Sequence, residues 1–261
     1  MLQFPNFNPY IFKLGPIHPT WYGLMYVIGF GCAYLLGVRR TKSNPAWTKE
    51  DVSDLMTYLM LGVVLGGRIG YVLFYGMGYW ARDWLYPLKI WEGGMSFHGG
   101  LLGVIFLLWL FGRKKGKAFW AVADYVAPMI PPGLFFGRIG NFINGELWGR
   151  PTDLPWGMVF PGTGDGIPRH PSQLYEAGLE GIVLFIAVWF YSAKPRRSGQ
   201  VAGLFLVLYG IFRSLVEMVR QPDGQVNFLI GEITMGQALS LPMIVFGLWL
   251  MLRRGPRASV S

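Results

Sequence analysis

Charged residues, cysteine and histidine are all scarce in this sequence. Only 14% of its 261 residues are charged, against roughly 25% in ordinary soluble domains, so the composition argues against a soluble globular protein. The single cysteine, Cys32, excludes an intrachain disulfide framework and a cysteine-ligated metal site. The three histidines, His18, His98 and His170, are too scattered to predict a metal centre. We therefore expect no bound metal.

Apolar and aromatic residues are correspondingly abundant. Hydrophobic residues make up 52% of the sequence, and its 11 Trp and 13 Tyr suit a protein that places amphipathic rings at lipid–water boundaries. The 37 Gly are typical of helices that pack closely within a membrane. The composition therefore predicts an all-α integral membrane protein.

Seven apolar runs approach the length of about 20 residues that crosses a bilayer as a helix. The fourth run contains Pro128, Pro131 and Pro132, so we expect this helix to be kinked or broken. The seven predicted transmembrane helices cover residues 21–38, 54–75, 96–112, 119–137, 173–191, 201–218 and 233–252.

The net charge of +9 is distributed as topology signals. Lys and Arg form short clusters between the apolar runs and gather on no binding face, so we expect no nucleic acid partner. Fourteen of the 23 basic residues follow the first, third, fifth and seventh runs, whereas six lie on the opposite side. Because cytoplasmic loops carry the excess of Lys and Arg, the N-terminus is predicted outside and the C-terminus in the cytoplasm.

The segments outside the helices complete the predicted organisation. Residues 1–20 hold four prolines among aromatic residues, which suits an arm lying in the membrane interface. The longest connection is rich in Gly, Pro and Asp and is predicted to form an extracytoplasmic cap. In chain order we expect an interfacial arm (1–20), helices one to four (21–137), the cap (138–172), helices five to seven (173–252) and a basic cytoplasmic tail (253–261).

The densest group of polar residues is the stretch 137–150, which reads G-R-I-G-N-F-I-N-G-E-L-W-G-R. Glycine lets a ligand approach the backbone closely, and arginine offers a rigid fork of donors to a phosphate. At the outward end of the fourth helix, this stretch predicts an anion-binding site at the membrane surface. The alternative is a polar turn that only satisfies backbone groups at a helix end.

Ionisable residues within the predicted helices are costly and usually functional. Tyr209, Arg213 and Glu217 recur every four residues, so they share one helix face, and Arg220 follows them. This stripe is either a binding surface inside the bundle or a simple Arg213–Glu217 ion pair. Arg68 in the second helix has the same two interpretations, a substrate contact or a structural ion pair.

Other polar positions lie near the helix ends. Gln173, Glu176 and Glu180 share a face at the start of the fifth helix. Asp124 lies near the cytoplasmic end of the fourth helix and is expected to be structural. His98 lies between pairs of glycines where the third helix begins. Because a neutral imidazole accepts a proton near pH 7, His98 is either a catalytic base or a structural side chain.

Six motifs carry a family resemblance over nearly the whole chain. They are W-Y-G-L-M-Y at 21–26, G-G-R-I-G-Y-V-L-F-Y at 66–75, M-S-F-H-G-G-L-L-G at 95–103, the stretch 137–150, R-H-P-S-Q-L-Y-E at 169–176 and Y-G-x-F-R-x-x-x-E-x-x-R at 209–220. Together they closely resemble the bacterial prolipoprotein diacylglyceryl transferases.

The resemblance implies a seven-span enzyme of the bacterial inner membrane whose active site faces outward. That family moves the diacylglyceryl group of phosphatidylglycerol to the lipobox cysteine thiol of a prolipoprotein and releases glycerol-1-phosphate. The implied partners are phosphatidylglycerol, membrane lipid and prolipoprotein signal peptides with a lipobox cysteine. No metal or organic cofactor is implied, and we expect a monomer.

The resemblance also implies functional roles for His98, Arg138, Asn141, Glu146, Gly149, Tyr209, Arg213 and Tyr22. Catalysis is expected of His98, Arg138, Arg213 and Tyr209, and lipid binding of Arg138, Asn141, Asn144, Glu146, Gly149, Arg68, Tyr22, Glu217 and Arg220. The arginines would stabilise the negative charge that grows on the departing phosphate. For the attacking thiolate to form, either His98 removes the thiol proton or nearby arginines lower the thiol pKa.

Two other functions fit parts of this pattern. A transporter or channel for an anionic solute would also need intramembrane arginines and broken helices, but its polar residues would continue toward the cytoplasm. Here the polar positions gather in the outer halves of the predicted helices, which favours an enzyme. Another lipid-headgroup transferase would differ only in its acceptor.

Overall fold

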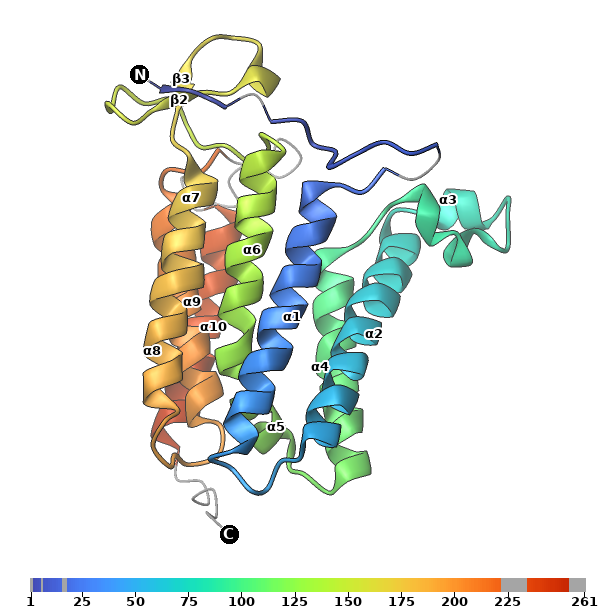
Figure 1. The fold of residues 1–261 in the computed structure, drawn as a ribbon, viewed down its shortest axis with the longest axis vertical. Helices are drawn as coiled ribbons and strands as arrows, with labels where there is room; N and C mark the ends of the chain where they lie inside the picture. Colours follow the sequence, from blue (N-terminus) through green and yellow to red (C-terminus); the bar gives the residue numbers. More distant parts are fainter. Residues whose placement is uncertain (1, 6, 16–17, 222–233, 254–261) are drawn as a thin grey trace. The chain divides into compact units, whose positions relative to one another are not determined.

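The computed structural model of the chain is mostly helical and describes residues 2–5, 7–15, 18–221 and 234–253 (Figure 1). Within these ranges, six helices have the length and apolar composition to cross a membrane. They are α1 (Trp21–Thr41), α2 (Lys49–Phe74), α4 (Phe97–Lys115), the continuous helical segment Ser172–Tyr191, α9 (Gln200–Glu217) and α10 (Met235–Leu252). The prediction of a helical, multi-pass membrane protein is confirmed.

The predicted fourth crossing is divided rather than being one helix. It consists of α5 (Phe119–Val126), a 3-10 turn η3 (Ala127–Met129) and α6 (Ile130–Ile143). Pro128 lies in the 3-10 turn, and Pro131 and Pro132 lie in the first turn of α6, where the N–H that proline lacks would have no helical partner. The predicted break is confirmed, but α6 continues to Ile143, well beyond the predicted end at residue 137.

The chain forms two compact units, Met1–Gly37 with Asp124–Val260, and Val38–Ala123. In the first unit the segment Ser172–Tyr191 is built from α7 (Ser172–Glu176), a π-helix η5 (Ala177–Val183) and α8 (Leu184–Tyr191). Here α6 packs against η5 and α7, and α9 packs against α8 and α10 (Figure 1). Gly181 of η5 lies so close to Phe135 of α6 that a side chain would collide there, which brings these two helices together.

A carboxylate from α5 holds the start of α9. Asp124 accepts hydrogen bonds from the backbone N–H groups of Gly199 and Ala202, at 2.6 Å and 2.8 Å. These bonds satisfy donors that a helix N-terminus leaves open, and the helix dipole favours an anion at this position. The structural role predicted for Asp124 is therefore confirmed.

A small sheet joins the start of the chain to the segment between α6 and α7. Strand β1 (Leu2–Gln3) pairs in parallel with β2 (Met158–Val159), which pairs in antiparallel fashion with β3 (Pro168–Arg169). The ring of Phe4 packs against Phe142 and Phe160 beside this sheet, with centroids 5.3 Å and 5.1 Å away. The predicted all-α fold omitted this sheet, because strands of two residues leave no alternating pattern in a sequence.

In the second unit, α2 and α4 run side by side (Figure 1). Gly62, Gly66 and Gly70 on α2 face Gly99 and Gly103 on α4, and a Cβ atom on any of them would meet the facing backbone. Small residues spaced by four positions allow this close helix contact in a membrane. The connection between the two helices contains α3 (Met77–Trp80), η1 (Tyr86–Leu88) and η2 (Ile90–Glu92).

Candidate active site

The predicted site residues are divided between the two units. His98 and Arg68 belong to the second unit. The first unit contains the other ten residues, Tyr22, Arg138, Asn141, Asn144, Glu146, Gly149, Tyr209, Arg213, Glu217 and Arg220.

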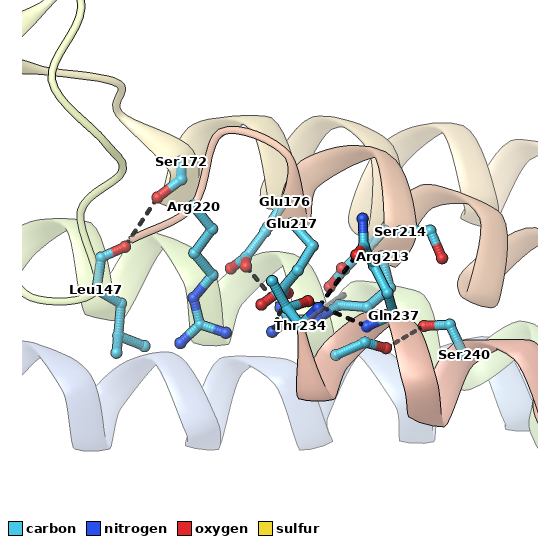
Figure 2. Close-up of polar contacts among 12 residues, drawn as sticks. Leu147, Ser172, Glu176, Arg213, Ser214, Glu217, Arg220, Thr234, Gln237 and Ser240 are labelled. Atoms are coloured by element: carbon cyan, nitrogen blue, oxygen red, sulfur yellow. Dashed lines mark hydrogen bonds and ion pairs between the residues drawn. The ribbon is translucent and has the colours of Figure 1, made fainter. Parts of the chain in front are cut away.

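Two arginines of the first unit share one buried carboxylate. Glu176 of α7 is only 1% exposed. Its Oε2 lies 2.7 Å from Arg138 Nε. Its Oε1 accepts a hydrogen bond from Arg213 Nη1 at 2.8 Å (Figure 2). Because Arg138 comes from α6 and Arg213 from α9, this carboxylate ties three helices together. The pairing offsets part of the cost of burying these charges.

Two further carboxylates flank this bridge. Glu217 lies one turn after Arg213 on α9, and its Oε2 is 2.9 Å from Arg213 Nη2 (Figure 2). It lies over Gly236 in the first turn of α10, where the helix dipole favours an anion. Glu180 of η5 is fully buried, and its Oε2 is 3.7 Å from Arg138 Nη2. The Arg213–Glu217 ion pair considered from the sequence therefore exists, but as one part of a larger network.

The other two members of the α9 stripe also face inward. Tyr209 is half-buried, stacks on Phe205 with ring centroids 5.9 Å apart, and packs against the core around Leu184. Arg220 is 8% exposed, and its backbone forms an isolated β-bridge with Gly149. The predicted inward-facing stripe on α9 is confirmed.

The stretch 137–150 is helical in its first half and turns sharply in its second. Asn141, in the last turn of α6, donates from Nδ2 to Glu146 Oε1 at 2.7 Å, and Asn144 Nδ2 donates to the same oxygen at 3.4 Å. Gly145 and Leu147 both have positive φ angles, 64° and 59°. Glycine adopts this conformation readily, whereas leucine must be held in it by its surroundings.

Side chains at the start of α7 hold that turn. Ser172 Oγ donates to the carbonyl oxygen of Leu147 at 2.9 Å, as Figure 2 shows. Gln173 Nε2 donates to the carbonyl oxygen of Glu146 at 2.5 Å. Both Ser172 and Gln173 are fully buried, so their donors have few alternatives to these carbonyls. The face of α7 that binds the arginines through Glu176 therefore also fixes the backbone of the turn.

Gly149 lies where three segments of the first unit meet. Its N–H donates to the His170 carbonyl oxygen at 2.8 Å, and the next N–H, of Arg150, donates to the Val219 carbonyl oxygen at 2.8 Å. A Cβ atom at position 149 would lie 2.5 Å from Val219 O and 2.7 Å from His170 Cβ. Only glycine fits here. Close packing therefore explains why this residue is glycine, separately from the lipid binding expected from the sequence.

Tyr22 lies on α1, beside the last turns of α6. Its hydroxyl is 3.1 Å from the hydroxyl of Tyr26. Its ring lies over Gly140, where a side chain would collide with it. Gly140 immediately precedes Asn141, so Tyr22 packs next to the residues that orient Glu146.

Arg68 in the second unit binds backbone carbonyl oxygens instead of a carboxylate. It is 3% exposed. Its Nη2 donates to Tyr86 O at 2.6 Å, its Nε donates to Pro87 O at 3.2 Å, and its Nη1 donates to Gly93 O and Gly94 O. The structural ion pair considered from the sequence is therefore wrong in its partner. Arg68 instead fixes the loop that precedes α4.

His98 is an exposed residue in the first turn of α4. Ser96 caps this helix, because its Oγ accepts a hydrogen bond from Gly99 N at 3.2 Å. Ser96 N in turn donates to Gly67 O at 2.9 Å, next to Arg68 on α2. The backbone before His98 is thus anchored to α2.

Four residues that were not among the predicted site residues contact the site, namely Ser172, Gln173, Glu176 and Glu180. The common face of the last three was visible as a spacing of three and four residues. Nothing in that spacing identifies the partners of these side chains, since Arg138, Arg213 and Glu146 all lie on other elements.

The fold and this network define a multi-pass membrane protein with a buried arginine–carboxylate site near its helix ends. Ionisable groups in such segments are costly to keep and are usually functional. Residues 9–253 match the family model described as prolipoprotein diacylglyceryl transferase. The chain belongs to this family.

Relatives of the same family match over the full length. The chain is 58% identical to a phosphatidylglycerol–prolipoprotein diacylglyceryl transferase of Solidesulfovibrio magneticus, with 100% of each chain covered. It is 57% identical to the proteins with the same name from Nitratidesulfovibrio vulgaris and Bordetella avium, with 99% of each chain covered.

Proposed function

We propose that this chain transfers the diacylglyceryl group of phosphatidylglycerol to a cysteine thiol of prolipoproteins, the first step of bacterial lipoprotein maturation. Its family and the names of its full-length relatives support this pair of substrates. The structural observation that carries the proposal is the pair Arg138 and Arg213, held together on Glu176 within a helical membrane protein. Paired guanidinium groups within the helices of a membrane protein suit the phosphate of a lipid.

The reaction exchanges one bond for another at a glyceryl carbon. The thiolate sulfur attacks the carbon that carries the phosphate ester, a C–S bond forms, and the C–O bond breaks. The bonding electrons leave with the phosphate oxygen as glycerol-1-phosphate, and the thiol proton passes to a base. The product is a thioether on the lipobox cysteine, and the lipid supplies the activated group without a further cofactor.

Arg138 and Arg213 would stabilise the departing phosphate. Negative charge increases there in the transition state, so donors already in place give differential stabilisation. Each guanidinium has five N–H donors, and Glu176 takes a nitrogen from each, so both arginines retain donors for phosphate oxygens. Tyr209 on α9 and Arg220, three residues after the end of α9, would support this binding.

Two routes to the thiolate follow from the residues. His98 would accept the thiol proton as a general base, the role that histidine takes most often in catalysis. Alternatively, the arginines would lower the pKa of the bound thiol below its free value of about 8.5. The two routes differ in what replacement of His98 does to turnover.

The headgroup would be oriented by the turn after α6. Asn141 and Asn144 already share Glu146 Oε1, and Tyr22 packs beside them on Gly140. Amides, a carboxylate and a phenol together offer both donors and acceptors to the hydroxyl groups of a glycerol headgroup. Gly149 and Arg68 would act through the backbone that they hold in place, and Glu217 by orienting Arg213.

The proposed topology is a bacterial inner-membrane protein with its active site outside. Counting α5 and α6 together as one crossing gives seven spans, with the N-terminus outside and the C-terminus in the cytoplasm. Residues 1–20 would form the interfacial arm, 138–172 the extracytoplasmic cap and 253–261 the cytoplasmic tail. Of the tail, only Arg253 lies within the described residues. We propose a monomer that meets lipid and signal peptide within the membrane.

A reconstituted reaction tests this function. Purified protein in detergent is supplied with phosphatidylglycerol and a lipobox peptide, and glycerol-1-phosphate release is followed. We expect release to require both the lipid and the peptide cysteine, and to be lost in Arg138→Ala. Arg213→Lys keeps the charge but not the fork of donors, so we expect it to retain only part of the rate.

His98→Gln in the same assay separates the two routes to the thiolate. A loss of about 10²-fold or more supports proton abstraction by His98, whereas near-normal turnover favours ionisation assisted by the arginines. If the wild-type protein binds lipid and peptide yet releases no product, the transferase proposal fails. An anion transporter would then be the better explanation of the intramembrane arginines.

A further inference from the structure

We infer that Glu176 is a positioning residue that sets the separation and orientation of Arg138 and Arg213 for the phosphate of the lipid. This inference rests on the proposed function and assigns a role to a side chain that was not among the predicted site residues. Of the carboxylates in the described part of the chain, it is the one that contacts both arginines.

The contacts of Glu176 are divided between its two oxygens. Oε2 lies 2.7 Å from Arg138 Nε and Oε1 lies 2.8 Å from Arg213 Nη1. The two arginines belong to α6 and α9, and Glu176 on α7 packs against both helices. A rigid carboxylate between two guanidinium groups therefore fixes their spacing, much as a phosphate would.

The neighbouring carboxylates cannot replace this bridge. Glu217 contacts Arg213 from the same helix, and Glu180 approaches only Arg138, at 3.7 Å. Without Glu176, the two guanidinium groups would repel each other in a buried setting where charge is weakly screened. Each arginine would then follow its own remaining partner, and the pair would lose its common geometry.

The exposed fractions of these side chains also support a positioning role for Glu176. The side chain of Glu176 is 1% exposed, whereas those of Arg138 and Arg213 are 18% and 13% exposed. The carboxylate is thus almost inaccessible, whereas both arginine side chains retain some exposed surface. A phosphate can reach the arginines while Glu176 holds them from the buried side.

Glutamine is the most informative replacement. A glutamine amide has one acceptor oxygen and one NH₂ donor, so one arginine would face a donor in place of an acceptor. Glu176→Asp keeps the charge but is shorter by one methylene, and it should reach only one of the two arginines. Both variants keep a polar side chain at a fully packed position, which limits other disturbance.

The experiment is steady-state kinetics with varied phosphatidylglycerol, expressed per mole of folded protein. Folding is checked by thermal unfolding and gel filtration in detergent. For Glu176→Gln we expect kcat/KM for the lipid to fall by about 10²-fold, because misplacement of about 1 Å has this effect. KM for the lipid should rise, while KM for the lipobox peptide stays unchanged. Glu176→Asp should show a smaller change of the same kind.

Two controls make the result specific. Glu50→Gln makes the same chemical change on an exposed side chain in the first turn of α2, and it should match the wild type. In the double variant Glu176→Gln with Arg213→Lys, the combined loss should be smaller than the product of the single losses, because both changes act on one arginine pair.

Three results would overturn the inference. They are an unchanged KM for the lipid in a folded Glu176→Gln variant, losses that multiply in the double variant, or wild-type kinetics for Glu176→Asp where Glu176→Gln does not fold. Failure of the proposed function looks different, because the wild-type protein itself would then release no glycerol-1-phosphate.

Discussion

Three arginines in this protein, Arg68, Arg138 and Arg213, are each held by more than one acceptor. Arg68 binds four carbonyl oxygens, while Arg138 and Arg213 each contact two carboxylates. A guanidinium group oriented in this way needs little rearrangement when a ligand arrives, which is the condition for effective electrostatic stabilisation. The partners differ in charge. The carbonyl oxygens around Arg68 are neutral, whereas the carboxylates beside Arg138 and Arg213 offset the positive charge of their guanidinium groups.

The glycine at position 149 leads to a prediction at this scale. In Gly149→Ala the added methyl group would collide with Val219 O and His170 Cβ, which belong to two separate segments. Overpacking of this kind costs about 1–3 kcal/mol. We expect a lower thermal midpoint and reduced turnover, measured by differential scanning fluorimetry and by product release.

Gly31→Ala is the matched control for this substitution. Position 31 lies in helix α1, and a Cβ atom there would have no neighbouring atom within 4 Å outside the helix's own backbone. Alanine stabilises a helix by about 1 kcal/mol relative to glycine, so its midpoint should stay the same or rise. An undisturbed midpoint in Gly149→Ala would show that the three segments can separate without loss.

At the scale of elements, α7 and η5 carry the side chains that hold the other parts of the site in place. One face carries Ser172 and Gln173, which bind the backbone of the turn, followed by Glu176 and Glu180, which contact the arginines. All four side chains are essentially inaccessible to solvent. The predicted fifth span therefore positions residues from α6, from α9 and from the turn that follows α6.

Helix positions could be predicted because they depend on local sequence. Long apolar runs gave the spans, and Pro128 gave the break before α6. The start of α2 was predicted at residue 54 but lies at Lys49, because the Thr48–Asp51 capping box extends the helix into polar sequence. The partners of Glu176 and Arg68 could not be predicted, since they depend on which elements meet in three dimensions.

The stability of the predicted cap, residues 138–172, should depend on pH through His170. Burial lowers the pKa of His170, so the folded cap favours the neutral imidazole. Its contribution to stability is complete above the unfolded pKa of about 6.5 and is lost as the pH falls below that value. Arg169 holds the pKa of Asp165 at about 2, so Asp165 stays ionised throughout this range.

Hydrogen exchange of residues 149–170 at pH 8 and pH 5.5, corrected for intrinsic rates, measures this effect. We expect faster exchange at the lower pH in the wild type and a much weaker dependence in His170→Gln. Equal pH dependence in both proteins would assign the effect to another group.

At the scale of the whole molecule, the sequence predicted the membrane class and orientation from composition and charge. The helical, multi-pass character is confirmed, while the orientation stays a prediction. The site stays a prediction as well; ten of its predicted residues belong to one compact unit, and His98 and Arg68 belong to the other. Composition carries no information about that division, because it arises from packing between helices.

Orientation can be tested with single cysteines. In a Cys32→Ala background, Asp165→Cys places a thiol in the cap and Lys42→Cys places one after α1. A membrane-impermeant maleimide should label position 165 in intact cells and position 42 only after lysis. Labelling in the opposite order would reverse the proposed topology.

The π-helix η5 makes this segment unusually tolerant of a change in length. Each turn of η5 contains about one more residue than a turn of α-helix, so removal of one residue, such as Gly178, would let the segment relax to regular α-helix. Glu176 and Glu180 would then be three residues apart and would still share one helix face. The same deletion within α9 would rotate the residues after it by about 100° relative to those before it.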